Sequence, residues 1–198
     1  MKSRDAQILD AALQVFLRYG VKRASMGDIA AEAGVSRQTL YKFYTNKDDI
    51  LRGSIRAYGQ ASVAAIAADM PAQLDLGGQI DLVFREMAVK PFEFLGLSPH
   101  AHDLIEGFND AGRSEMDALR GEYQAVLENV LAPHAAALAT RGLRPVQLAE
   151  ILARFAYSAK HQARDAAHLT DLLRGIRDMA VTSAGVARAP THVAEAAR

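Results

Sequence analysis

The sequence predicts an all-α protein with a small N-terminal domain of three helices and a larger helical domain behind it. Apolar residues recur along most of the chain at the i, i+3, i+4, i+7 spacing of amphipathic helices. Ser, Asn, Pro and Gly separate these stretches at positions where helices begin and end. No segment of useful length shows the alternation of a β-strand, and roughly nine helices are expected in total.

The first helix is expected over residues 3–19, because Ser3 is suited to cap its start and Gly20 follows its last apolar residue. One broad apolar stripe runs along it and would close a small core behind the next two helices. The stripe consists of Ile8, Leu9, Ala12, Leu13, Val15, Phe16 and Tyr19.

Residues 25–51 contain two short predicted helices joined by a tight turn. Ser25 and Ser36 are suited to cap the two helices, and Gly34 supplies the left-handed residue that ends the first one. Two helices that cross steeply at such a turn form a helix-turn-helix. An ordinary helical hairpin with a polar outer face is the alternative that the spacing leaves open.

The second short helix, predicted over residues 37–44, has one apolar side and one polar side. Leu40, Phe43 and Tyr44 are expected to face inward. Arg, Gln and Thr near the start of a helix can bond to base edges in a major groove, and Tyr and Lys can reach phosphates. The predicted base-edge contacts are Arg37, Gln38 and Thr39, and the predicted phosphate contacts are Ser25, Tyr41, Lys42 and Lys47.

The first quarter of the chain resembles the N-terminal DNA-binding domain of the TetR family of bacterial one-component transcriptional regulators. The sequence signs that carry the resemblance are AALQVFLRYG at residues 11–20, Ile29-Ala30, Ala33-Gly34-Val35-Ser36, Leu40-Tyr41 and Asn46-Lys47-Asp48-Asp49-Ile50-Leu51. The chain departs from the family's usual pattern at Ala24-Ser25 and at Phe43-Tyr44, which bears on single contacts.

The remaining helices follow from apolar stripes and their boundary residues. Asn46 is expected to cap a long helix that ends near residue 70, and residues 73–78 read as a linker. The next helix is expected to end or kink at Pro91. Further helices are predicted over residues 99–112, over 113–141 with a kink at Pro133, from residue 145 to about 161, and up to Gly185. The expected domains are 1–52 and 53–185, followed by a loose tail at 186–198.

Composition bounds the classes of function that are open to the chain. The 198 residues include no Cys, which excludes a disulfide framework, a thiolate metal site and a cysteine nucleophile. The 23 basic and 23 acidic residues are unevenly distributed: residues 1–56 hold ten and six, a net +4, and the rest holds thirteen and seventeen, a net −4. A basic head suits binding to phosphates, although this charge is too small to establish it alone.

The sequence contains no motif that indicates catalysis, a cofactor or a metal. It has no G-x-S-x-G elbow, phosphate-binding glycine loop or H-E-x-x-H pair. His100 and His102 diverge by about 200° on a helix and cannot hold one ion by themselves. We therefore expect no enzyme activity and no metal. The absence of a signal-like start and of a long apolar run predicts a cytoplasmic protein with no membrane partner.

Aromatic and methionine side chains gather between residues 84 and 123, where they are candidates to line an apolar pocket for a small effector. Ordinary core packing is the alternative for each of them. The region near Pro91 is favoured because a break in a helix leaves irregular backbone beside the core. The predicted effector contacts are Phe84, Met87, Phe92, Phe94, Phe108, Met116, Tyr123 and His161.

Helix-turn-helix proteins commonly read palindromic DNA as dimers, since two half-sites provide two sets of contacts to one duplex. The resemblance implies that the last two helices, at about 145–162 and 168–183, pair with those of a second subunit. Their apolar residues, including Leu152, Phe155, Leu173 and Ile176, fit an intrachain core equally well.

The expected function is that of a transcriptional regulator. The resemblance implies a homodimeric repressor that binds a palindromic operator in double-stranded DNA and is released by a small, largely apolar effector. Two alternatives stay open: a DNA-binding regulator that has a protein partner in place of a small effector, and a helical small-molecule enzyme.

Overall fold

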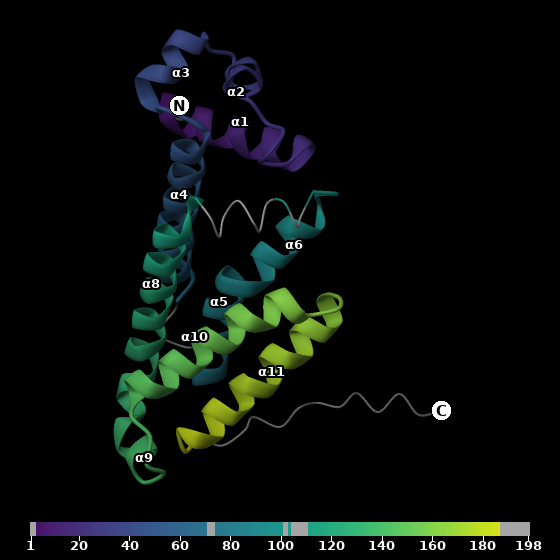
Figure 1. Ribbon diagram of the computed structural model, residues 1–198. Coiled ribbons are helices and arrows are strands. Elements are labelled where there is room, and N and C mark those ends of the chain that lie inside the picture. The colour runs from purple at the N-terminus through teal and green to yellow at the C-terminus, as the bar shows by residue number, and fades with distance from the viewer. Residues whose placement is uncertain (1–2, 71–73, 101–102, 104–110, 187–198) are drawn as a thin grey trace.

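The computed structural model describes residues 3–70, 74–100, 103 and 111–186, and the regular structure within these ranges is helical (Figure 1). The all-α prediction is therefore confirmed. Most of the predicted helix at 99–112 lies outside the described residues, as do residue 73 of the predicted linker and residues 187–198 of the predicted tail.

The N-terminal head is built from α1 (Arg4–Tyr19), α2 (Met26–Glu32) and α3 (Arg37–Phe43). The hydroxyls of Ser3, Ser25 and Ser36 accept backbone N–H bonds at the starts of the three helices, as the sequence predicts. Gly20 and Gly34 have φ of 79° and 64°, the left-handed region that glycine adopts without strain. The helices therefore begin and end close to where local chemistry places them.

Phe43 and Tyr44 do not share the inner side of α3, so the prediction for Phe43 is wrong. Phe43 is 44% exposed and Tyr44 is 7% exposed. The helix ends at Phe43, and the extended backbone of Tyr44 turns its ring inward against Gly53 of the next helix. The Tyr44 hydroxyl donates to the Asp5 carboxylate at 2.6 Å. Tyr44 thus fills the space beside Leu40 that sequence periodicity also assigned to Phe43.

The body begins with α4 (Lys47–Asp69), which Asn46 caps as predicted. The other elements are α5 (Leu76–Phe84), the π-helical η1 (Arg85–Val89), α6 (Lys90–Gly96), α8 (Arg113–Leu131), the 3-10 turn η2 (Ala132–His134), α9 (Ala135–Ala139), α10 (Pro145–Gln162) and α11 (Ala166–Ser183). Figure 1 shows α4 descending from the head with α8 beside it, and α10 packs against both α8 and α11. The predicted break at Pro133 is the turn η2.

The buried apolar residues form two clusters. One lies in the head and consists of residues from Ile8 to Leu51. The other lies in the body and runs from Ile66 to Ala184, with α5, α8, α10 and α11 as its main contributors. Ile50 and Leu51 at one end of α4 belong to the first cluster, and Ile66 near its other end belongs to the second. A single helix therefore anchors the head to the body.

The helical backbone continues through Pro91, which lies near the start of α6. The residues just before it form the π-helical turn η1. Within this turn the Lys90 N–H donates to the carbonyl of Arg85, five residues earlier. Pro91 has no N–H with which to continue this pattern to the carbonyl of Glu86. That carbonyl instead accepts a hydrogen bond from the Tyr58 hydroxyl of α4 at 2.7 Å. The proline thus leaves an acceptor that α4 satisfies.

We predict that Tyr44→Phe lowers the free energy of unfolding by about 1 kcal/mol, because it removes a partly buried hydrogen bond to a carboxylate. Burial and this bond raise the pKa of Tyr44, so its hydroxyl remains a donor at neutral pH. Urea unfolding at one fixed protein concentration measures the change. Tyr41→Phe makes the same chemical change at an exposed position and is expected to be neutral within about 0.5 kcal/mol. Equal effects of the two variants would contradict the assignment.

Candidate DNA-binding surface and ligand cavity

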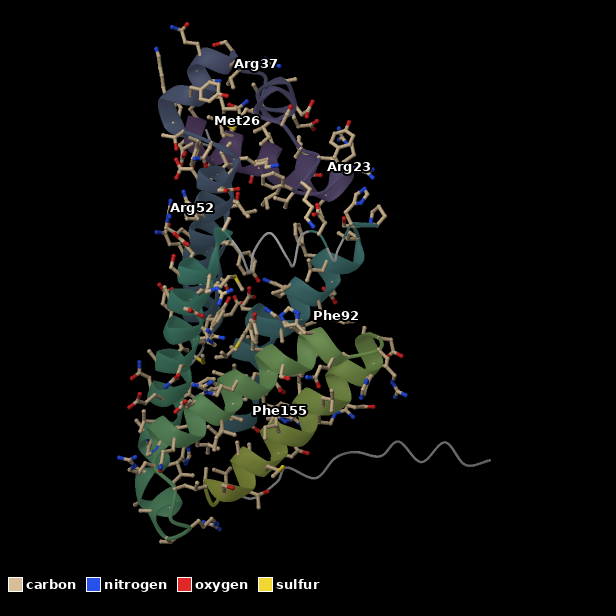
Figure 2. The ribbon with its side chains drawn as sticks, viewed as in Figure 1. Arg23, Met26, Arg37, Arg52, Phe92 and Phe155 are labelled. Carbon is tan, nitrogen blue, oxygen red and sulfur yellow. The ribbon has the colours of Figure 1, made fainter. Side chains whose placement is uncertain are left out.

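The outer face of α3 carries exposed polar side chains at the end of the molecule that is remote from α10 and α11 (Figures 1 and 2). Arg37, Gln38, Tyr41 and Lys42 are all exposed. These are four of the residues that the sequence assigns to DNA contacts. They lie on one short helix whose opposite side is held by the buried Leu40, so the head presents them together.

Arg37 lies across the first turn of α2. A Cβ atom at Gly27 would collide with the Arg37 guanidinium, which shows how closely the two approach. The pKa of Asp28 is lowered, mainly by the hydrogen bonds from Ser25 and to a smaller extent by the Arg37 charge. Sequence reasoning missed Gly27, because a lone glycine in a first helical turn gives no sign of the side chain that rests on it.

The other three predicted DNA contacts have hydrogen-bond partners within the head. Ser25 and Asp28 form a reciprocal capping box at the start of α2. The Thr39 hydroxyl lies 2.9 Å from that of Ser36. The Lys47 ammonium donates to the carbonyls of Lys22 and Ala24 at 3.3 and 3.2 Å. An ammonium has three donors, so Lys47 can hold the turn before α2 and still offer one N–H to a phosphate.

A cavity of about 350 Å³ lies between the head and the body, within the size range of small-molecule sites. Its walls come from α1, α4, η1, α6, α8 and α10. Five of the predicted effector contacts line it: Met87, Phe94, Met116, Tyr123 and His161. Pro91, near which the sequence places the effector site, lines it too. The other described lining residues are not among the predicted effector contacts: Leu13, Ser54, Ile55, Tyr58, Lys90, Leu95, Leu119, Arg120, Tyr157 and Lys160.

The remaining predicted effector contacts are not in this wall. Phe84 is buried in the body core, and Phe92 packs against the same core. Phe92 and Phe94 point apart because residues two positions apart on a helix diverge by about 200°. Only Phe94 therefore faces the cavity. Phe108 lies outside the described residues.

A chain of hydroxyl groups crosses one side of the cavity. The hydroxyls of Ser62 and Tyr123 are 2.6 Å apart, and that of Tyr123 lies 3.5 Å from the Glu86 carbonyl that Tyr58 also contacts. Burial raises the pKa of Tyr123 to about 12 and raises that of Tyr58 as well, so both phenols are neutral donors. They connect α4, η1 and α8 around the π-helical turn.

Basic side chains from three elements also reach the cavity. Lys90 pairs with the buried carboxylate of Glu86 at 2.6 Å, and Arg120 pairs with Asp117. Lys160 lies 4.7 Å from the centre of the Tyr157 ring, and burial together with the Arg120 charge lowers its pKa to about 8. Burial and the Lys160 charge lower the pKa of His161. Periodicity reveals none of this grouping, because α8 and α10 meet only through tertiary packing.

The cavity also touches the head directly. Leu13 of α1 lines it, and Leu95 at the end of α6 both lines it and packs against the head core. Just beyond α6, the Ser98 hydroxyl donates to the carbonyl of Leu17 at 2.8 Å. A molecule in the cavity would therefore contact the elements that hold the head in place.

Among the described residues, no three His, Cys, Asp or Glu side chains come together in a way that would hold a metal ion. None of the helices in those ranges has the length and apolar character needed to cross a membrane.

Fold and site together define an all-helical protein with a helix-turn-helix head and a ligand-sized cavity beside it. In comparison with known proteins, residues 8–53 match the family described as "Bacterial regulatory proteins, tetR family". The head and the first turns of α4 are therefore similar to this family of bacterial regulators.

The relatives match only part of the chain. The transcriptional repressor LfrR of Mycolicibacterium smegmatis is 35% identical over 96 residues, which are 41% of this chain and 50% of LfrR. The chain thus spans about half the length of this relative.

Two solved structures share the fold over nearly the whole chain. FadR from Bacillus subtilis, solved with stearoyl-CoA, has a TM-score of 0.64 at 18% identity and covers 90% of this chain and 98% of its own. SmeT of Stenotrophomonas maltophilia, solved with triclosan, has a TM-score of 0.63 at 21% identity and covers 92% and 91%.

We predict that Gly59→Ala lowers the free energy of unfolding by up to about 2 kcal/mol, although alanine favours a helix more than glycine. A Cβ at Gly59 of α4 would lie 2.9 Å from Leu119 of α8, so the cavity wall would have to shift. Gly121 of α8 has nothing within 4 Å of such an atom. Gly121→Ala is therefore expected to stabilise by about 0.5–1 kcal/mol. Urea unfolding compares them, and stabilisation by both would disprove the close contact.

Proposed function

We propose that the protein is a transcriptional repressor that binds a palindromic operator as a homodimer and releases it when a small, largely apolar molecule occupies the cavity. The observation that carries this proposal is the helix-turn-helix head, with its exposed α3 face, beside a cavity lined partly by α1 and α4. The proposed division at residues 52 and 53 falls within α4, between the head and body cores.

Sequence-specific binding to DNA is supported by the arrangement of α3. Its N-terminal residues Arg37 and Gln38 are exposed where a recognition helix meets base edges. Tyr41 and Lys42 follow on the exposed surface and are suited to phosphates. The net charge of +4 over residues 1–56 adds a general attraction to DNA. Thr39, Ser25 and Lys47 are proposed as further contacts that can take part while keeping bonds in the head.

Dimerisation through α10 and α11 is supported by apolar side chains on their outer faces. Ile151 is 49% exposed and Met179 is 66% exposed, whereas Leu152 and Leu173 are buried within the chain. Phe155 on α10 and Leu172 and Ile176 on α11 pack against the body core and remain partly exposed. The two helices pack against each other, and exposed apolar side chains on neighbouring helices are typical of an interface. We propose that a second copy covers them.

Release by an effector is supported by the position of the cavity. A ligand there would contact Leu13 of α1, Tyr58 of α4 and Leu95 of α6, which all connect to the head or carry it. A ligand shifts a conformational equilibrium only through different contacts in the two states, and these three elements supply such contacts. FadR with stearoyl-CoA and SmeT with triclosan show that proteins of this fold bind small molecules.

The two alternatives are less well supported. A regulator without a small effector has no need of a cavity of about 350 Å³. An enzyme finds no support among the proteins compared above, which are named as regulators or repressors. Binding of DNA and of small molecules therefore remains the pair of activities to test.

Selection of bound sequences from random DNA tests the proposed DNA-binding function. We expect a palindrome whose half-site centres lie about 10 base pairs, or a multiple of this, apart. Gln38→Ala is expected to change the preferred bases, because this side chain is placed to bond to base edges. Lys42→Ala is expected to keep the preference, weaken binding to all sequences and reduce the salt dependence by about one phosphate contact.

The two α3 variants control for each other, since both remove one exposed side chain from the same helix. Identical changes of sequence preference in both would contradict the division into base and phosphate contacts. Recovery of no enriched sequence by the wild-type protein at low salt would reject the DNA-binding function itself.

We predict that Met179→Glu weakens self-association by at least about tenfold, because it places a charge in the proposed apolar interface. Sedimentation at several protein concentrations measures the association. Leu97→Glu adds the same charge at a side chain that is 77% exposed near the end of α6 and is expected to leave association unchanged. A monomeric wild-type protein, or equal association in both variants, would refute the proposed interface.

A further inference from the structure

The cavity combines an apolar lining with a charge of one sign. Its described lining residues include Lys90, Arg120 and Lys160, and none of them is Asp or Glu. The remaining surface is supplied mostly by aliphatic, methionine and aromatic side chains. Such a chamber has places for an apolar body and for a negative group, and it has no described carboxylate in its wall to attract a cation.

The three basic residues differ in how their charges are balanced. Lys90 is neutralised by the buried carboxylate of Glu86, and Arg120 by Asp117. For Lys160, no carboxylate partner is found among the described residues. A partly buried charge without a counter-charge is unfavourable. Binding of a negatively charged group beside Lys160 would therefore stabilise this part of the cavity.

Tyr157 positions two of these cations. The guanidinium of Arg120 lies 5.1 Å from the centre of its ring, and the ammonium of Lys160 lies 4.7 Å from it. His161 meets the same ring edge-on at 4.8 Å between centroids. One aromatic ring therefore contacts hydrogen-bond donors from both α8 and α10 at one part of the cavity wall. The charges of Arg120 and Lys160 repel each other there unless an anion binds between them.

We propose that the cavity takes an amphipathic organic anion, with its acid group bound by Lys160 and Arg120 and its apolar body among Met87, Phe94 and Met116. This inference rests on the proposed function, in which the same cavity holds the effector. An anion supplies the counter-charge that Lys160 lacks and reduces its repulsion by Arg120. A neutral ligand leaves both effects in place, and a cation adds to the repulsion.

The proposal predicts a defined pH dependence. The charged and titratable groups around Lys160 are Arg120, Tyr157, His161 and the Lys90–Glu86 pair, together with Tyr58 and Tyr123 across the cavity. Lys160 has a pKa of about 8 in the folded protein, below its ordinary value, so it is charged at pH 7 and loses its proton as pH rises through 8. Affinity for a carboxylate should therefore be level around pH 7, where the ligand is ionised and Lys160 is charged, and fall as pH rises through 8.

Calorimetric titration of the full chain with decanoate, decanol and decyltrimethylammonium tests this inference. These probes share a ten-carbon chain and differ in charge. At pH 7 we expect decanoate to bind at least about tenfold more tightly than decanol, and the ammonium compound to bind most weakly. Equal affinity for acid and alcohol, a preference for the ammonium compound, or no binding of decanoate would overturn the proposal.

Lys160→Met separates the charge from the shape of the cavity. It should remove the preference for decanoate and its fall above pH 8, while affinity for decanol is retained. The folded protein lowers the pKa of Lys160, so the charged side chain destabilises the fold below pH 8. Lys160→Met is therefore expected to melt at a higher temperature than the wild type at pH 7.

Arg154→Met is the control, because it removes a cation that is paired with Glu150 on the same helix but outside the cavity lining. It should leave the preference for decanoate intact. An unchanged preference in Lys160→Met would overturn the proposal.

Operator DNA distinguishes failure of this inference from failure of the proposed function. Decanoate that binds in the charge-dependent way and also releases the selected DNA supports both. Charge-dependent binding without any effect on DNA supports the anion site and rejects its role as the effector site. Release of DNA by decanol as readily as by decanoate supports an effector cavity and rejects the anion.

Discussion

The helix α4 belongs to both apolar cores, and the relation between head and body depends on this shared packing. Ile50 and Leu51 are buried with α1, α2 and α3, while Ile66 is buried with the body helices. Between these ends, α4 presents Ser54, Ile55 and Tyr58 to the cavity. A packed helix transmits displacement because its neighbours interlock and do not deform freely. The cavity therefore lies beside the segment that carries the head.

A backbone carbonyl without an N–H partner lies beside the part of the cavity wall opposite α4. Pro91 lacks the N–H that would bond to the Glu86 carbonyl, and Tyr58 and Tyr123 approach this acceptor from α4 and α8. The carboxylate of Glu86 is only 2% exposed and is matched by Lys90 and Arg85. Both polar groups of one residue are thus satisfied at the π-helical turn, a kind of irregularity that is frequent at functional sites.

The charges of the cations on the other side of the cavity are balanced differently. Glu86 and Lys90 neutralise each other, whereas Lys160 is held by an aromatic ring and faces the charge of Arg120. Such an arrangement lowers stability in the absence of a ligand, and stability is commonly sacrificed in this way at binding sites. The neutral hydroxyl groups of Tyr58 and Tyr123 and the charged groups of Arg120 and Lys160 line the same cavity, so one ligand can contact both kinds of group.

The sequence by itself determined the helices and the helix-turn-helix. Ser25, Ser36 and Asn46 cap their helices through bonds to neighbouring residues, and Gly34 adopts its turn because it lacks a Cβ. These are interactions within a few residues, which a linear pattern contains. The exposed Gln38 and Lys42 could be predicted for the same reason, since the period of a helix places them opposite Leu40.

Tertiary structure alone decided which side chains share a space. Tyr44 displaces Phe43 from the core because Gly53 of another helix leaves room for its ring and Asp5 accepts its hydroxyl bond. Phe94 faces the cavity, while Phe84, equally apolar, lies in the core. Burial and charge pairing depend on distances between helices that are remote along the chain, and no local pattern of residues records those distances.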